Sequence, residues 1–174
     1  LYSFDLRYDR CTATAARLGA ALADMPGVLR VLYPTRSDHP DHNRSVSLLG
    51  GEGGHMVSFE LAGGRAQANA FVRAAEGLNF APTLGDIATT ISHPETSSHR
   101  ALTPEARGEI GITPGFFRIS VGCEAPDALI SAFPVPPLSQ VTPDDPTSTE
   151  APPASLVTFD PIVTVPSASS VGLM

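Results

Sequence analysis

A long apolar stripe at the start of the chain limits the available folds more than any other feature. Its members step by three and four positions, the spacing of one helix face: Phe4, Tyr8, Cys11, Ala15, Leu18, Leu22 and Met25. Pro26 and Gly27 follow and stop the pattern. The stripe predicts a long helix over residues 1–25. Because an apolar face must be covered, the rest of the chain has to supply a packing surface.

After this helix, strand and helix patterns alternate. Strands are predicted at 28–33, 56–61, 87–92 and 116–122, and helices at 65–77, 104–109 and 124–133. Thr103 before Pro104 is a typical helix start, and residues 34–42 form a predicted polar loop. Few connections are long enough to join parallel neighbours. The order therefore predicts an α+β fold with an antiparallel or mixed sheet and helices on one face.

The composition changes sharply after residue 133. Residues 134–174 contain 9 of the 17 prolines, four acidic residues and no basic one. A segment of this kind cannot bury enough apolar surface to offset its chain entropy. We therefore expect one small α/β domain over 26–133 and a disordered tail over 134–174.

Charge and cysteine content argue against several classes of function. A net charge of −7 without any basic cluster argues against a nucleic-acid partner or an anionic membrane surface. No apolar run reaches the roughly 18 residues of a membrane span, and we expect a cytoplasmic protein. Cys11 and Cys123 lie 112 positions apart and fit no metal-binding spacing, so two free, buried thiols are expected.

Two groups of loop residues have the composition of metal ligands. They are His39 and His42 with Asp38 and Asp41, and His93 with Glu95 and His99. Zinc sites hold their ligands on rigid elements, whereas both groups lie in proline-containing loops without a matched partner pair. We expect no metal site. Solvated histidines, or hydrogen bonds that brace the loop, are the preferred interpretation.

Arg118 is a charged residue within an apolar, alternating strand. A guanidinium cannot shed its charge and therefore needs an anionic partner. The residues alone leave two alternatives open. Arg118 forms a structural ion pair with an acid such as Asp86 or Glu124, or it binds the carboxylate of a ligand through two hydrogen bonds.

Several ordered motifs resemble one enzyme family. TLGDIATTISHPETSSHRALTPEARGEIGITPGFFRISVGCEAPDALI resembles the C-terminal signature of the pyridoxal-phosphate-dependent enzymes of Cys/Met metabolism. This family includes cystathionine γ-synthase, cystathionine γ-lyase, methionine γ-lyase and O-acylhomoserine sulfhydrylase. LRYDRCTATA, LADMPGVLRVLYP, HPDHNRS and GGHMVSFEL resemble the preceding stretch in the same order, so that the resemblance covers roughly residues 1–133.

The resemblance implies the small C-terminal domain of a fold-type I pyridoxal-phosphate enzyme, joined to a large cofactor-binding domain by the long helix. In the family, the arginine of an RLSVG strand binds the substrate's α-carboxylate, and RISVG places Arg118 there. A family serine before Leu-Gly corresponds to Thr83, which keeps the hydroxyl. We expect Arg118 and Thr83 to bind substrate. Pro82 and Ala88 depart from the family pattern and leave the reaction open.

The resemblance also implies what this chain lacks. The family's Schiff-base lysine, phosphate-binding glycines and ring-stacking tyrosine lie upstream, and the chain has eleven arginines and no lysine. We therefore expect no catalytic or cofactor-binding residue here, and pyridoxal 5'-phosphate bound by a missing large domain.

The complete enzyme is expected to be a homo-oligomer that acts at the β or γ carbon of a sulfur amino acid or O-acylhomoserine. The fragment alone is expected to be inactive. The alternative is a non-enzymatic α+β ligand-binding module or a degenerate enzyme remnant.

Overall fold

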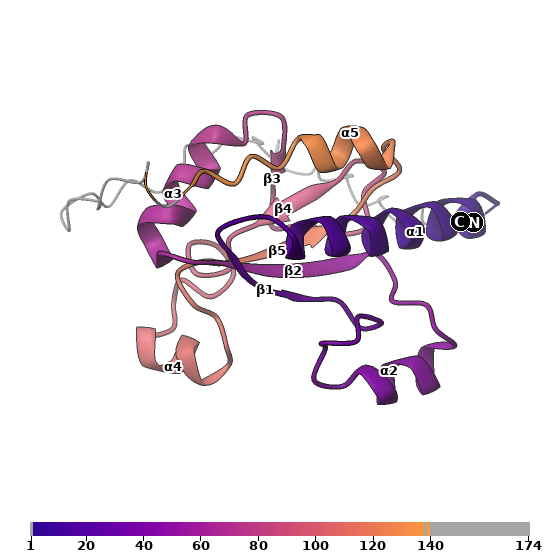
Figure 1. The fold of residues 1–174 in the computed structure, drawn as a ribbon, viewed down its shortest axis with the longest axis horizontal. Helices are drawn as coiled ribbons and strands as arrows, with labels where there is room; N and C mark the ends of the chain where they lie inside the picture. The colour runs from indigo at the N-terminus through magenta and orange to yellow at the C-terminus, as the bar shows by residue number, and fades with distance from the viewer. Residues whose placement is uncertain (1, 138, 140–174) are drawn as a thin grey trace, which may run out of the picture.

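A computed structural model describes residues 2–137 and 139, and helices and strands alternate along this part of the chain (Figure 1). In order they are α1 (Phe4–Ala23), β1 (Val28–Leu32), α2 (His42–Leu49), β2 (Met56–Leu61), α3 (Gly64–Ala74), β3 (Asn79–Phe80), β4 (Thr90–Ser92), α4 (Pro104–Glu109), β5 (Phe116–Ser120) and α5 (Pro126–Ser131). The tail predicted over 134–174 lies outside the described residues, except for 134–137 and 139.

The strands form one mixed sheet in the order β1-β2-β5-β4-β3. β1 with β2, β2 with β5, and β4 with β5 are antiparallel, whereas β3 and β4 are parallel. This confirms the predicted α+β fold with a mixed sheet. Because β3 and β4 run in the same direction, the connection 81–89 has to return along the sheet before β4 begins.

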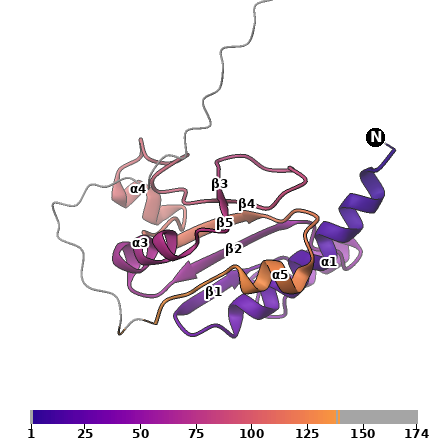
Figure 2. The same ribbon diagram turned by 90° about the horizontal axis from the view of Figure 1, so that it is seen from above.

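Three helices cover one face of the sheet: α1, α3 and α5 (Figures 1 and 2). The core between these layers is rich in aromatic rings. Phe59, Phe71 and Phe117 are fully buried, and each ring contacts the other two with centroids 5.0 to 5.6 Å apart. Such ring pairs add to the stabilisation that comes from burial alone.

The first helix buries only part of its predicted stripe. Leu18 and Leu22 are fully buried, whereas 53% of Phe4 is exposed and Leu6 is exposed beside it. Figure 2 shows the reason, since the first turns of α1 extend past the edge of the sheet. The rest of this chain, in the part that the structure describes, does not cover that end of the stripe.

The other two helices lie below the sheet in Figure 1 and bury no residue. α4 begins as predicted, because the Thr103 side chain accepts a hydrogen bond from the Ala106 N–H at 3.3 Å. α2 was not predicted, and it begins at His42, where the polar loop was expected to end. β4 is shorter than the predicted strand over 87–92, because residues 87–89 belong to the returning connection.

Candidate functional site

Arg118 lies on the sheet face opposite the three covering helices. Its neighbours along β5, Phe117 and Ile119, point into the core and are fully buried. Across the sheet, Arg118 pairs with Ser58 on β2 and Ser92 on β4. Directly opposite residues share a face of the sheet. The guanidinium therefore stands between two small hydroxyl side chains, which leave it space but bring no negative charge.

The guanidinium of Arg118 has few partners for a group of its kind. One terminal nitrogen, Nη2, donates a hydrogen bond to the Thr83 carbonyl oxygen at 3.2 Å. Its Nε is buried and has no hydrogen-bond partner among the described residues. An arginine carries five N–H donors in a planar fork, and it is normally placed where a carboxylate or phosphate can use them.

The two acids suggested as structural partners are engaged elsewhere. Asp86 accepts a hydrogen bond from the Ala88 N–H at 3.3 Å. The Glu124 carboxylate accepts from the backbone and the side chain of Thr89, the latter at 2.8 Å. Within residues 2–137 and 139, Arg118 takes part in no ion pair. Of the two alternatives left open by the sequence, the structural ion pair is not formed among the residues that the structure describes.

Thr83 lies beside Arg118, and the hydrogen bond between them uses the backbone carbonyl of Thr83 rather than its hydroxyl. The Thr83 carbonyl accepts from Arg118 and also from the Thr90 hydroxyl at 3.2 Å, while the residue itself is exposed. Two residues further on, Gly85 donates its N–H to the Ser120 hydroxyl at 2.9 Å. These bonds hold the returning connection 81–89 against the open face and make it a wall next to the guanidinium.

A second set of bonds ties this connection to the residues just after β5. Cys123 donates its N–H to the Ile87 carbonyl at 2.8 Å, and Gly122 donates to the Thr89 hydroxyl at 2.9 Å. A Cβ at position 122 would lie 2.4 Å from the Ile87 oxygen, which no side chain tolerates. Glycine at this position thus permits the close approach of the two segments.

His93 braces its loop through both ring nitrogens. Nε2 lies 2.9 Å from the Pro114 carbonyl and Nδ1 lies 3.0 Å from the Thr96 hydroxyl, so that a neutral ring donates at Nε2 and accepts at Nδ1. The ring also packs on Phe117. Burial lowers the pKa of His93, since the charged form is poorly solvated there. The imidazole therefore has a structural role in this loop.

Glu95, Asp38, His39 and His99 also have protein partners, whereas the His42 Nδ1 is buried and has no hydrogen-bond partner among the described residues. Glu95 is buried and pairs with Arg65 at 2.7 Å and with Arg107 at 3.2 Å. Asp38 pairs with Arg36, and the His39 Nδ1 accepts the Asp41 N–H at 3.1 Å. In the described part of the chain, no three His, Cys, Asp or Glu residues come together in a way that could hold a metal ion.

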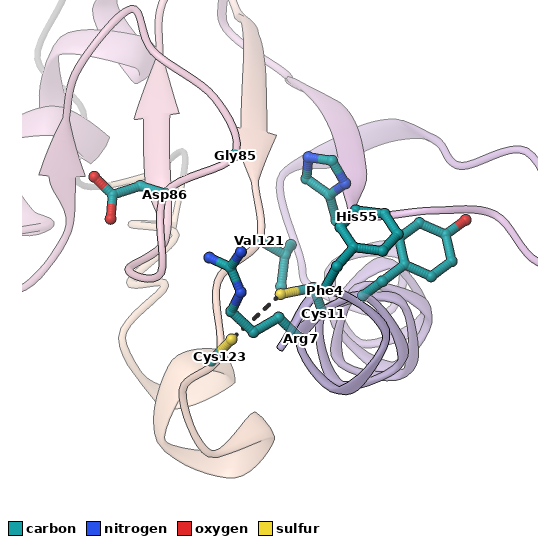
Figure 3. A pocket seen from close by; sticks show the side chains of 9 residues that line it. Phe4, Arg7, Cys11, His55, Gly85, Asp86, Val121 and Cys123 are labelled. Carbon is teal, nitrogen blue, oxygen red and sulfur yellow. Dashed lines mark hydrogen bonds between the residues drawn. The ribbon is translucent and has the colours of Figure 1, made fainter. Parts of the chain in front are cut away.

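Two thiols meet at a pocket near the first turns of α1, which the sequence did not indicate. The Sγ atoms of Cys11 and Cys123 are 3.6 Å apart, and both cysteines are free (Figure 3). They line a pocket of about 110 Å³ together with Arg7, Gly85 and other residues drawn in Figure 3. Their separation of 112 positions carries no motif, so only the folded chain shows the pair.

Family models and known proteins give a consistent comparison. The model for "Cys/Met metabolism PLP-dependent enzyme" matches residues 1–134. The chain is 37% identical over 129 residues to O-succinylhomoserine sulfhydrylase from Pseudomonas aeruginosa, covering 74% of this chain and 32% of that protein. It is 35% identical over 129 residues to L-methionine gamma-lyase from Pseudomonas putida, with the same coverage of both.

Solved structures show the same likeness in three dimensions. Cystathionine gamma synthase from Xanthomonas oryzae pv. oryzae, in complex with aminoacrylate and cysteine, aligns with a TM-score of 0.68 at 32% identity. The alignment covers 75% of this chain and 34% of that structure. The chain thus spans about a third of the length of the curated relatives it matches. Among the described residues, no helix has the length and apolar character to cross a membrane.

Proposed function

The chain belongs to the family of pyridoxal-phosphate-dependent enzymes of Cys/Met metabolism, and on this premise we propose that Arg118 binds the α-carboxylate of an amino-acid substrate. The proposed reaction is of the transsulfuration type, at the β or γ carbon of a sulfur amino acid or O-acylhomoserine. Thr83 helps by orienting the guanidinium through its carbonyl oxygen. The chain supplies the substrate-binding side of the active site.

The observation that carries this proposal is the incomplete set of partners around Arg118. The guanidinium lies on the open sheet face between two serines, with its Nε buried and without a hydrogen-bond partner in the described part of the chain. A buried donor without a partner costs free energy, about 1–3 kcal/mol, and a charged one costs more. A bound carboxylate removes this cost, because its two oxygens can accept two parallel N–H groups of one arginine.

The chain does not contain the lysine that would hold the cofactor. Pyridoxal phosphate supplies the electron sink of this family and is carried on a lysine, whereas this chain has none. None of its residues can take the place of that amine. We propose that the cofactor-binding residues lie in a large domain outside this chain, that the chain alone is inactive, and that the complete enzyme forms a homo-oligomer.

The test is the Arg118→Ala variant of the full-length enzyme. Loss of a charge-assisted contact of about 1.5–3 kcal/mol predicts a KM higher by roughly ten- to a hundredfold for the amino-acid substrate. Arg73→Ala is the matched control, because Arg73 is exposed at the end of α3 and away from this face. Arg118→Lys, which keeps the charge but not the fork, should fall between. An unchanged KM in Arg118→Ala would refute the assignment.

One observation favours a second candidate, a ligand-binding module without enzymatic activity. The absence of lysine is total along these 174 residues. Two measurements on the protein from its natural source separate the candidates. An intact mass more than twice 18.1 kDa, with an absorbance band from bound pyridoxal phosphate, supports the enzyme. A mass near 18.1 kDa without that band supports the module.

A further inference from the structure

Cys11 and Cys123 bring two distant parts of the chain into contact. Cys11 lies in the middle of α1, and Cys123 lies between β5 and α5, five residues beyond Arg118. Their sulfur atoms are 3.6 Å apart and unoxidised. We propose that these two residues form a reversible disulfide under oxidising conditions, and that it links α1 to the wall of the Arg118 site.

The geometry allows the bond to form with a small movement. A disulfide needs sulfur atoms about 2.05 Å apart, so the present distance of 3.6 Å has to shorten by about 1.5 Å. Cys11 is fixed on a helix whose adjoining residues Thr14 and Ala15 are fully buried. Cys123 belongs to a short irregular connection, which can adjust its backbone more readily than a packed helix can.

The surroundings also give the two thiols different roles. Both line the pocket of about 110 Å³ that Figure 3 shows, which has room for a molecule as small as a peroxide. Cys11 is only 8% exposed, whereas Cys123 is partly exposed. Burial raises the pKa of Cys11 to about 11 and keeps that thiol protonated at neutral pH. Cys123 is therefore the sulfur that meets an oxidant first, and Cys11 is the resolving thiol.

The oxidation balances with a peroxide as the oxidant. The Cys123 sulfur, after losing its proton, attacks one peroxide oxygen and breaks the O–O bond, which gives a sulfenic acid and, with hydrogen peroxide, one water. The Cys11 sulfur then displaces the sulfenic hydroxyl, which leaves as the second water together with the Cys11 proton. Two thiols have lost two electrons and two protons to the peroxide. A dithiol reductant reverses the change by exchange.

The new bond would act on the connection beside Arg118. Cys123 holds the Ile87 carbonyl through its N–H, and its neighbour Gly122 holds the Thr89 hydroxyl. A displacement of Cys123 toward α1 therefore pulls on the segment that carries Thr83. This effect on substrate binding rests on the proposed function, whereas the disulfide itself does not.

The test is peptide mapping of the full-length protein before and after hydrogen peroxide, with free thiols alkylated and the digest kept unreduced. We expect a cross-linked pair of peptides containing Cys11 and Cys123 to replace the two alkylated peptides, and dithiothreitol to restore them. The Cys11→Ser variant should accumulate trappable sulfenic acid at Cys123, and Cys123→Ser should leave Cys11 alkylatable. Substrate KM of the oxidised and reduced forms is then compared.

Three results would overturn the disulfide: both peptides still alkylated after peroxide, Cys123 over-oxidised without a cross-link, or a cross-link between molecules. The mapping of the unmodified protein decides the question even if a serine variant does not fold. A cross-link that forms while Arg118→Ala leaves KM unchanged supports the disulfide and refutes the proposed function. A cross-link that forms without changing KM, when Arg118→Ala raises it, overturns the coupling to the site.

Discussion

The two faces of strand β5 differ in how fully their side chains are engaged by the rest of the chain. On the covered face, Phe117 and Ile119 are fully buried, and the Phe117 ring meets the rings of Phe59, Phe71 and His93. On the open face, Arg118 lies between two serines and, within the described part of the chain, its side chain forms a single hydrogen bond, to a backbone carbonyl. On the covered face, the side chains of β5 are enclosed by the packing contacts of the core. The open face retains binding capacity that the described chain does not use.

A comparison of two arginines on the sheet, Arg30 and Arg118, shows the same difference in how their charges are paired. Arg30 on β1 lies opposite Glu60 on β2, and its Nε donates to that carboxylate at 2.6 Å. Glu60 is further held by the Thr113 hydroxyl at 2.7 Å. Arg118, in contrast, has no carboxylate partner in the described part of the chain. Arg30 is thus paired within the sheet. Arg118, which has no such partner among the described residues, is the candidate for binding a ligand.

The largest effect is expected on the covered face. Phe117→Ala removes the ring at the centre of the aromatic cluster and should lower the free energy of unfolding by about 3–5 kcal/mol. Phe116→Ala, on the half-buried opposite side, should cost roughly 1–2 kcal/mol, because less surface is lost. Urea unfolding followed by circular dichroism measures both. Equal losses would contradict the contrast between the two faces.

A smaller, pH-dependent effect is expected from His93, a buried histidine on the covered face. Its pKa is lowered in the folded state, mainly by burial, with Arg65 and Arg107 acting in the same direction and Glu95 against it. The unfolded chain therefore binds a proton first. Stability is complete above about pH 6.5 and falls as the pH drops, with a slope of at most about 1.4 kcal/mol per pH unit.

Urea midpoints measured across this range check the His93 prediction. The His93→Gln variant removes the titrating group and should show a flatter profile, although its stability at neutral pH is lower because the Pro114 and Thr96 contacts change. A slope of the same size in this variant would assign the pH dependence to other groups.

The smallest effect is expected from replacing each arginine by an apolar residue of similar length. Arg118→Met should leave the free energy of unfolding unchanged or raise it by up to about 1 kcal/mol, because no ion pair is lost and a buried, unpaired nitrogen is removed. Arg30→Met should lower it by up to about 1 kcal/mol, as for other partly exposed pairs. Thermal and urea unfolding of both variants give the sign. A clear loss in Arg118→Met would show that this guanidinium stabilises the fold.

Local pattern was sufficient to predict most of the elements that contribute to the core, but not β3, because a strand of two residues is too short to show an alternating pattern. The alternation of Phe117, Ile119 and Val121 gave the strand and its buried side, and Thr103 before Pro104 gave the start of α4. α2 was missed because it buries nothing, so its leucines, Leu48 and Leu49, lie exposed and follow no core-facing period. The sequence did contain one sign of a helix end, Gly50, because glycine often follows the last helical residue. In the structure Gly50 has the left-handed backbone typical of that position, with φ 62°.

The site was only partly open to prediction from the sequence. Arg118 was singled out because a charge within an apolar strand needs an explanation. Its serine neighbours depend on the register between strands, and the Thr83 carbonyl contact depends on the path of the returning connection. A short sequence motif predicts neither the register between strands nor the path of this connection. The meeting of Cys11 and Cys123 is a long-range contact of the same kind.

The position of Arg118 also bears on how enzymes of this kind could diversify. In the proposed role, the guanidinium binds the α-carboxylate, which every α-amino acid has. It does not contact the part of the substrate that differs between amino acids. A binding site for this shared group is compatible with many reactions. The chain is indeed 37% identical to a protein named as a sulfhydrylase and 35% identical to one named as a γ-lyase. Other parts of the protein can then determine which substrate is accepted, while Arg118 on this strand binds the shared α-carboxylate.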